Sequence, residues 1–136
     1  MAKHITVLIA DDNVHMRESL RILISPVENL KLLGEAKNGE EAIAYASELN
    51  PDIILMDINM APVNGFEATR KIVKLFPQIK IIGLSLHTEP AYCRNLMRLG
   101  AKGYVTKSSP YEEILIAIQQ VAAGNRYVDK GVPGCM

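Results

Sequence analysis

Three acidic residues of this 136-residue chain stand where short apolar runs end, a placement suited to metal binding or phosphoryl transfer. Asp11 and Asp12 follow the run Ile5–Ala10, and Asp57 follows the run Ile53–Met56. Grouped carboxylates raise one another's pKa unless a cation lies among them. Carboxylate oxygens suit Mg²⁺, which usually keeps positions open for water and phosphate oxygens. The three acids therefore predict a Mg²⁺ site that also receives a phosphate group.

A hydroxyl and an amine follow two further apolar runs. Ser85 comes directly after Ile79–Leu84, and Lys107 comes shortly after Gly103–Val105. A hydroxyl can donate a hydrogen bond to a phosphate oxygen, and a lysine ammonium is a mobile point charge for phosphate. Both groups fit the chemistry that the three acids predict.

The elements that must position these groups alternate along the chain. Short apolar runs are separated by stretches in which apolar residues recur at helical spacing. The runs are Ile5–Ala10, Leu30–Ala36, Ile53–Met56, Ile79–Leu84 and Gly103–Val105. Five such units predict an α/β, doubly wound, flavodoxin-like fold with a five-stranded parallel sheet of order 2-1-3-4-5. In that order the first and third strands flank the point where the strand order reverses, which is where ligands bind.

Each of these residues has a plainer explanation when it is taken alone. Asp12 or Asn13 could cap the helix that follows. Asp57 could be a turn residue at the end of its strand. Ser85 and Lys107 carry little information singly. Because all the groups lie at strand ends around one predicted crevice, the pattern favours a shared site.

Local signals predict where the last helices and the domain end. Ser109 followed by Pro110 predicts the N-cap and first turn of the last helix. Gly100 and Gly124 stand where helices should end. We expect one domain over residues 1–123 and a C-terminal tail or linker with frayed structure over residues 124–136.

Composition argues against several classes of protein. Lys and Arg number 15 and Asp and Glu number 15, so the formal net charge is zero, whereas a dedicated binder of nucleic acid or anionic membranes needs a basic surplus. No stretch approaches about 18 apolar residues and no signal segment is evident, so we expect a cytoplasmic protein without membrane contact. Cys93 and Cys135 form no CxxC pair, and we expect two reduced thiols.

Three stretches of the chain resemble the receiver domains of two-component response regulators, and the resemblance covers about residues 5–123. The stretches are Val7–Asp12, Leu55–Met60 and Gly100–Lys107. The separation of Asp57 from Ser85, and of Ser85 from Lys107, is also typical of that family. The segment from Ile114 to Val128 is similar to receivers of the NarL/FixJ (LuxR-type) transcription regulators.

The resemblance implies how the acids act. Asp57 would be the phosphoacceptor, which takes a phosphoryl group from a phosphohistidine of a sensor histidine kinase. Asp12, Asp57 and the backbone carbonyl of Asn59 would bind Mg²⁺, and Asp11 would act mainly through a bound water. The protein would be a signalling domain rather than an enzyme, with at most self-phosphorylation and autodephosphorylation.

The resemblance also implies a switch. Lys107 would pair with the phosphoryl oxygens, Ser85 would hydrogen-bond to them, and the switch aromatic Tyr104 would turn inward. The output face would be the surface of the fourth helix, fifth strand and fifth helix, and a homodimer could form through it. Candidate contacts on that face are Tyr92, Arg94, Arg98 and Tyr111, although either arginine alone is more simply a solvated residue. DNA would be bound only by a helix-turn-helix domain that is absent from this chain.

Two departures from the family pattern affect the loops of the site. Ser108 stands after Lys107 where many relatives have a proline after a cis bond, so we expect a trans bond here. Ala61 intervenes between Met60 and Pro62 where relatives usually have the proline at once. His87 and Asn59 stand where relatives vary and where the dephosphorylation rate is set.

Three rival functions remain open. An aspartyl phosphatase wants a second acid two residues after its nucleophile, where this chain has Asn59. A flavin mononucleotide binder would need a Gly-, Ser- and Thr-rich phosphate loop in place of the acidic pair. An adaptor that kept the fold without being phosphorylated is the third. The complete set of chemical groups favours the receiver.

Overall fold

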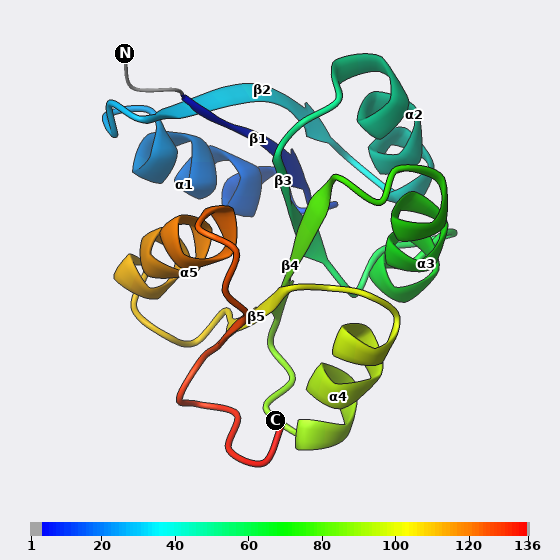
Figure 1. Ribbon diagram of the computed structural model, residues 1–136, viewed down its shortest axis with the longest axis vertical. Helices are drawn as coiled ribbons and strands as arrows, with labels where there is room; N and C mark the ends of the chain where they lie inside the picture. The colour runs from blue at the N-terminus through cyan, green and yellow to red at the C-terminus, as the bar shows by residue number, and fades with distance from the viewer. Residues whose placement is uncertain (1–3, 136) are drawn as a thin grey trace.

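Strands and helices alternate through residues 4–135, the part of the chain that the computed structural model describes (Figure 1). The strands are β1 Ile5–Ala10, β2 Leu30–Ala36, β3 Ile53–Asp57, β4 Lys80–Ser85, β5 Gly103–Thr106 and β6 Tyr127–Val128. The helices are α1 Val14–Ile24, α2 Gly39–Leu49, α3 Gly65–Leu75, α4 Pro90–Arg98 and α5 Glu112–Ala122. The alternation confirms the predicted α/β class and its βα units.

The sheet is parallel throughout, with the order β2-β1-β3-β4-β5-β6. The predicted order 2-1-3-4-5 is confirmed for the first five strands, but the predicted count of five was wrong. The sixth strand, β6, pairs with β5 through the register Gly103↔Tyr127 and Tyr104↔Val128. Two residues are too few to show an alternating pattern, so periodicity could not reveal β6.

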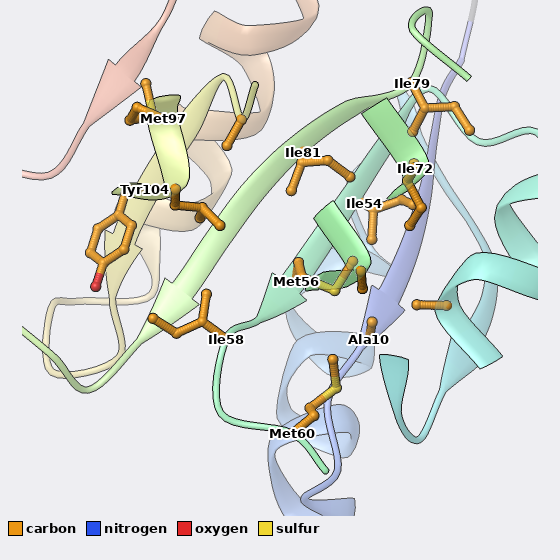
Figure 2. Close-up of a cluster of buried hydrophobic side chains, with 14 of the residues drawn as sticks. Ala10, Ile54, Met56, Ile58, Met60, Ile72, Ile79, Ile81, Met97 and Tyr104 are labelled. Carbon is orange, nitrogen blue, oxygen red and sulfur yellow. The ribbon is translucent and has the colours of Figure 1, made fainter. Parts of the chain in front are cut away.

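Helices cover both faces of the sheet, and alternate strand residues supply two separate cores. Figure 1 shows α1 and α5 on one face and α2, α3 and α4 on the other. In β1, Val7 and Ile9 belong to the core under α1 and α5, while Leu8 and Ala10 belong to the opposite core. Figure 2 shows part of this second core, in which Ala10 lies near Met56. Strands buried on both faces explain the continuous apolar runs.

Asparagines cap the helices that follow β1, β2 and β3. Asn13 accepts hydrogen bonds from the backbone amides of His15 and Met16, at 2.9 and 3.1 Å. Asn38 and Asn64 cap α2 and α3 in the same way. The cap of α1 is therefore Asn13, so the side chains of the two acids before it are available for other roles.

The predicted ends of the last two helices were partly right. Gly100 and Gly124 follow α4 and α5 with φ of 115° and 99°, as expected for residues that end a helix in the left-handed region. The prediction of Ser109 as the N-cap of α5 was wrong. Tyr111 holds that position without a side-chain cap, because the hydroxyl of Ser109 bonds instead to Thr106 and Asp129.

The two cysteines form a disulfide, so the expectation of two reduced thiols was wrong. Cys93 of α4 is bonded to Cys135 in the C-terminal segment, with their Cα atoms 5.7 Å apart. The pairing spans 42 residues of sequence, and no local spacing pattern indicates a contact at that separation.

Within residues 4–135, no helix is both long enough and apolar enough to cross a bilayer.

Candidate functional site

The residues predicted to act together lie at one edge of the sheet. Asp57 and Ser85 are the last residues of β3 and β4, and Asp11 directly follows β1. Lys107 directly follows β5. Because the strands are parallel, their carboxyl ends meet at the same edge, and β1 and β3 are neighbours there. The sheet therefore brings the predicted groups to the point where the strand order reverses.

Three carboxylates form one acidic cluster at this edge. One oxygen each from Asp11, Asp12 and Asp57 lies within 4.8 Å of the other two. Asp11 and Asp57 are buried, with 1% and 2% of their surface exposed, whereas Asp12 is exposed. Oxygen ligands in an octahedral Mg²⁺ shell lie about 3–4 Å apart, given Mg–O bonds of about 2.1 Å. The donor type and the spacing fit Mg²⁺, and the exposed Asp12 leaves the cluster open to solvent.

Lys107 supplies the positive charge in the cluster. Its Nζ lies 2.9 Å from Oδ2 of Asp11 and 3.3 Å from Oδ1 of Asp57. Burial acts to lower the pKa of Lys107, but the hydrogen bond to Asp11 and the charge of Asp57 raise it above its ordinary value. The lysine therefore stays charged and is placed to bind an anionic group that reaches Asp57.

The carboxylate of Asp57 is held through one of its two oxygens. Its Oδ1 accepts a hydrogen bond from the backbone amide of Asn59 at 3.1 Å and lies closest to Lys107. Both of these contacts use Oδ1, so Oδ2 is the oxygen placed to react or to bind a metal. Burial, followed by the charge of Asp11, raises the pKa of Asp57. A divalent cation in the cluster would favour the ionised, nucleophilic carboxylate.

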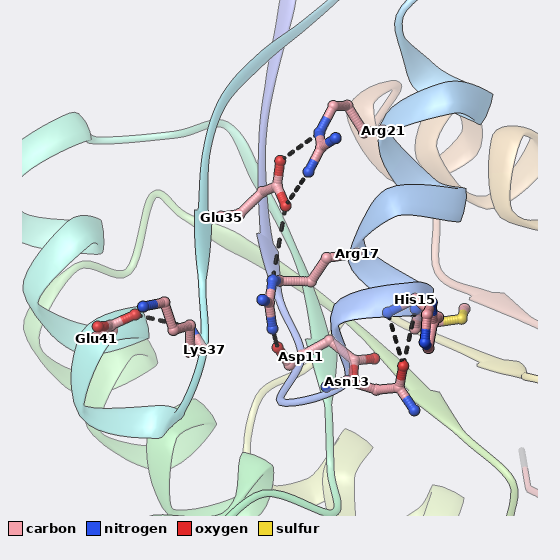
Figure 3. A network of polar contacts seen from close by, with 9 residues as sticks. Asp11, Asn13, His15, Arg17, Arg21, Glu35, Lys37 and Glu41 are labelled. Atoms are coloured by element: carbon pink, nitrogen blue, oxygen red, sulfur yellow. Dashed lines mark hydrogen bonds and ion pairs between the residues drawn. The ribbon is translucent and has the colours of Figure 1, made fainter.

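A polar network on the β2 side holds the loop that carries Asp11. Arg17 of α1 donates from Nη1 to the backbone carbonyl of Asp11 at 2.8 Å, and its Nε lies 3.7 Å from Glu35 of β2 (Figure 3). Arg21, one turn later, makes two hydrogen bonds to the same Glu35. Sequence reasoning missed the role of Arg17. The signal that could have found it is that Arg17 and Arg21 are four residues apart, so they share one face of a helix and can both pair with Glu35.

The Ser85 hydroxyl and the Tyr104 ring meet the same loop between β4 and α4. Ser85 Oγ accepts a hydrogen bond from the backbone amide of His87 at 2.9 Å. Tyr104 is fully buried, and its hydroxyl donates to the backbone carbonyl of His87 at 2.9 Å. The His87 ring stacks on Tyr92 of α4, with centroids 4.0 Å apart. Ser85, Tyr104 and α4 are therefore connected through His87, so a movement of Ser85 would change the contacts of the other two.

The loops around the site differ from one another in backbone geometry. The bond from Lys107 to Ser108 is trans, as expected, while the cis bond within residues 4–135 joins Ala61 to Pro62. The backbone amide of Lys107 donates a hydrogen bond to the backbone carbonyl of Ser85 at 2.7 Å, which fixes Lys107 next to the cluster. The serine after Lys107 therefore does not displace the ammonium group from the acids.

The candidate output residues lie where α4 and α5 face outward. Tyr92 and Tyr111 are exposed, as are Arg94 and Arg98. Arg94 is not simply solvated, because its Nη1 donates to the backbone carbonyl of Gly134 at 3.0 Å. The C-terminal segment thus reaches this face. Sequence reasoning missed that contact, together with the buried Asp129 that bonds to Thr106 and Ser109.

Comparison with known proteins gives a family match over most of the chain. A family model described as the response regulator receiver domain matches residues 7–119. Response regulator GacA of Pseudomonas aeruginosa is 40% identical over 124 residues, which cover 91% of this chain and 58% of GacA. Response regulator UvrY of Escherichia coli K12 is 37% identical over 124 residues, which cover 91% of this chain and 57% of UvrY. The chain therefore spans little more than half the length of these relatives.

Solved structures agree with the sequence matches. A LuxR-family two-component response regulator from Aurantimonas superposes with a TM-score of 0.90 at 32% identity, covering 98% of this chain and 93% of that one. The response regulator domain of Thermotoga maritima CheB superposes with a TM-score of 0.84 at 36% identity, covering 89% of this chain and 98% of that one. The fold and its family are thus supported by sequence and by structure.

Proposed function

We propose that this chain, which belongs to the response regulator receiver family, accepts a phosphoryl group on Asp57 from the phosphohistidine of a sensor histidine kinase. The observation that carries the proposal is the cluster itself. A buried carboxylate stands with two further carboxylates and a lysine ammonium at the reversal point of a parallel sheet. Receiver domains in general bind Mg²⁺ at such an acidic pocket, and phosphoacceptance is the family's function.

The transfer can be written on this chain's own atoms. Oδ2 of Asp57 attacks the phosphorus, an oxygen–phosphorus bond forms, and the phosphorus–nitrogen bond to the donor imidazole breaks. Lys107, 2.9 Å from Asp11, turns toward the incoming phosphoryl oxygens and offsets their charge. Asp11, Asp12 and Asp57, with the Asn59 carbonyl, would hold Mg²⁺, which supplies further charge compensation when bound.

The signal would leave the site through Ser85 and Tyr104. A phosphoryl group on Asp57 offers the Ser85 hydroxyl an acceptor for its proton. If Ser85 turns to donate to it, Oγ moves away from the amide that now donates to it, so one hydrogen bond is exchanged for another, and that amide belongs to His87. Tyr104 holds the carbonyl of that same residue, so the loop and α4 would move with the exchange. Phosphorylation would thereby favour one of two arrangements of the α4–β5–α5 face. A second copy of the chain is a candidate partner at that face.

The cellular location and regulatory role of this protein are inferred from its relatives. We infer a cytoplasmic receiver that includes the folded residues 127–135 beyond the predicted boundary at residue 123. We also infer that it regulates transcription, since DegU of Brevibacillus brevis, 34% identical over 124 residues, is a transcriptional regulatory protein. One matched structure is a complex of the response regulator RcsB with DNA. DNA binding by this protein would belong to a further domain rather than to the receiver, whose formal net charge is zero.

The proposal is tested by intact-mass spectrometry after incubation with acetyl phosphate and Mg²⁺. We expect one added phosphoryl group that hydroxylamine removes, and no addition when a chelator takes the Mg²⁺ away. Asp57→Asn should abolish the addition, because the amide keeps the shape and removes the nucleophile. Asp52→Asn is the matched control. Asp52 lies just before the first residue of β3, at the end far from the site, and its carboxylate accepts hydrogen bonds from Thr6. The Asp52→Asn protein should be phosphorylated normally.

Two results would contradict this assignment. Addition of a phosphoryl group to Asp57→Asn would place the acceptor elsewhere. Lack of addition to the unaltered chain, with Mg²⁺ binding shown by calorimetry, would favour the unphosphorylated adaptor.

A further inference from the structure

The segment after α5 is a folded cover on the α4–β5 side of the molecule. Its first residues form β6 against β5, and Figure 1 shows the rest continuing beside α4 to the C-terminus. Three of its side chains are buried, Asp129, Val132 and Cys135, with 4%, 2% and 7% of their surface exposed. The frayed tail that the sequence suggested is therefore absent from residues 127–135. We call these residues the strap.

One anchor of the strap is Asp129, which binds the residues on either side of Lys107. Its Oδ2 accepts hydrogen bonds from the amide of Thr106 at 3.1 Å and from the Thr106 hydroxyl at 3.2 Å. The hydroxyl of Ser109 donates to the same oxygen. The backbone amide of Asp129 donates to the carbonyl of Tyr104 at 3.0 Å. The strap therefore holds the loop that aims Lys107 and the strand that carries the switch aromatic.

The second anchor is the disulfide to α4. Cys93 is fully buried in α4, and its bond to Cys135 ties the end of the strap to that helix. The hydrogen bond from Arg94 to the carbonyl of Gly134 lies beside it. The strap is thus fixed at one end by ordinary hydrogen bonds and at the other by a bond that only a redox reaction can open.

Cys135 is the less buried cysteine of the pair, with 7% of its surface exposed against 0% for Cys93, so an attacking thiolate would approach from its side. Cys135 lines an open pocket of about 450 Å³ together with Arg94, Met97, Arg98 and Arg126. Three guanidinium groups around the entrance attract a negatively charged thiolate, the attacking form of a dithiol reductant. The chain as a whole has a formal net charge of zero, so the three arginines form a local concentration of positive charge.

We propose that Cys93–Cys135 is a thiol–disulfide exchange site for a dithiol reductant, and that its reduction allows the strap to leave α4. With the disulfide closed, the strap covers the face from which the phosphorylation signal would pass, and the receiver is held in one arrangement. With it open, only non-covalent contacts retain the strap, which are the pairing of β6 with β5, the hydrogen bonds of Asp129, the bond from Arg94 to Gly134 and the burial of Val132. A rearrangement of Thr106 and Ser109 around Lys107 would then weaken the hold of Asp129 on the strap. The link to phosphorylation rests on the function proposed above, whereas the exchange site stands independently of it.

The exchange balances in two steps. A thiolate of the reductant attacks Sγ of Cys135, the sulfur–sulfur bond breaks, and Cys93 leaves as a thiolate that takes up a proton. The second thiol of the reductant then displaces Cys135 from the mixed disulfide. The products are two cysteine thiols on this chain and an oxidised dithiol, a transfer of two electrons and two protons. In the cytoplasmic setting proposed above, such reductants keep most protein thiols reduced.

The experiment compares oxidised and dithiothreitol-reduced protein by intact mass and by hydrogen exchange of the strap. We expect a mass gain of about 2 Da on reduction and a rise on the order of tenfold in amide exchange over residues 127–135. At labelling times short relative to global unfolding, the amides of β1 and β3 should stay protected in both states. Cys135→Ser is the control, with fast exchange in the strap whether or not reductant is present. Free thiols in air-oxidised protein, or unchanged exchange on reduction, would overturn the proposal.

A second arm adds acetyl phosphate and Mg²⁺ to the reduced protein, with phosphoryl gain followed by intact mass. Strap exchange should rise further in molecules that carry the phosphoryl group, and it should stay low in the oxidised protein. Phosphorylation without any change in the reduced strap would overturn the coupling. If no phosphoryl group is added, the function proposed for Asp57 fails, while the redox result of the first arm is unaffected.

Discussion

At the scale of single residues, the site is a balance between three carboxylates and one ammonium group. Lys107 already neutralises part of the charge of Asp11 and Asp57 in the structure described here. Its positive charge therefore competes with that of a divalent cation for the same carboxylates, and in the proposed function it would move toward the phosphoryl group. Under the proposed function the lysine would act twice. It holds Asp11 and Asp57 together in this structure, and it would then bind the phosphoryl oxygens.

Replacement of Lys107 separates these two roles. In Lys107→Met we expect phosphoryl addition to slow by roughly 100-fold, because one stabilising charge at the transferring group is lost. Binding of Mg²⁺ should become tighter, because the competing ammonium is gone. Intact-mass time courses and calorimetric titration with Mg²⁺ give the two quantities. Lys102→Met, which removes an exposed lysine just before β5, should change neither quantity. Weaker Mg²⁺ binding in Lys107→Met would contradict the competition.

At the scale of elements, the loop from β3 to α3 is shaped by a close approach of backbone to backbone. Gly65 begins α3, and a Cβ added there would meet the carbonyl oxygen of Asp57 and the Cα of Ile58 closer than real Cβ atoms do. Neither contact is the end of a flexible side chain, so the loop that holds Asp57 would have to shift.

Gly65→Ala should therefore affect stability and phosphorylation together. We expect a loss of about 1–3 kcal/mol in the free energy of unfolding and slower phosphoryl addition to Asp57. Urea denaturation and intact mass measure the two effects. Gly34→Ala is the matched control, because its added Cβ would meet only side-chain methyl groups of Leu49 and Leu8. Equal effects of the two substitutions would mean that the close approach to Asp57 is not the cause.

The strap carries a pH dependence through Asp129. Burial acts to raise the pKa of this carboxyl, but the hydrogen bonds from Ser109, Gly131 and Thr106 hold it below its ordinary value. The stabilisation is complete above the ordinary value of about 3.9 and is lost as the pH falls through the lower folded value. In reduced protein, the amide resonance of Thr106 should follow this titration. Asp129→Asn should abolish it, and a midpoint above 3.9 in the unaltered chain would contradict the sign.

At the scale of the whole molecule, the disulfide joins two parts of the chain that are 42 residues apart in sequence. Closing a loop of that size restricts the unfolded chain, and reduction should lower the free energy of unfolding by about 2–4 kcal/mol. Urea denaturation with and without dithiothreitol measures the difference. Cys135→Ser should match the reduced protein and should not respond to dithiothreitol. A response in that variant would point to an effect of the reagent elsewhere.

The parts of the fold that sequence could predict are those repeated along the chain. Each apolar strand ends in a polar group, and parallel strands bring those ends together, so Asp57 and Lys107 could be placed at one edge before any coordinates were known. Their roles in phosphoryl transfer remain predictions until the experiments above are done. The geometry adds what local patterns omit, such as the bond from Arg17 to the carbonyl of Asp11.

The parts that sequence missed depend on contacts between distant residues. The strand β6 has only two residues, and its pairing with β5 is defined by a partner rather than by a period. Ser109 had every local mark of an N-cap, but the carboxylate of Asp129 offered its hydroxyl a charged acceptor. The disulfide joins Cys93 to a residue whose position depends on the strap being folded.

The stacked rings of His87 and Tyr92 give the molecule an optical property. The chain has five tyrosines and no tryptophan, so its intrinsic emission comes from phenol rings alone. The Tyr92 ring lies 4.0 Å from the imidazole of His87, whose backbone amide is held by Ser85. A change at the phosphate site that shifts this loop would alter what the Tyr92 phenol contacts. If the proposed switch moves this loop, Tyr92 is the tyrosine whose emission should change, and removing its ring would remove that part of the signal.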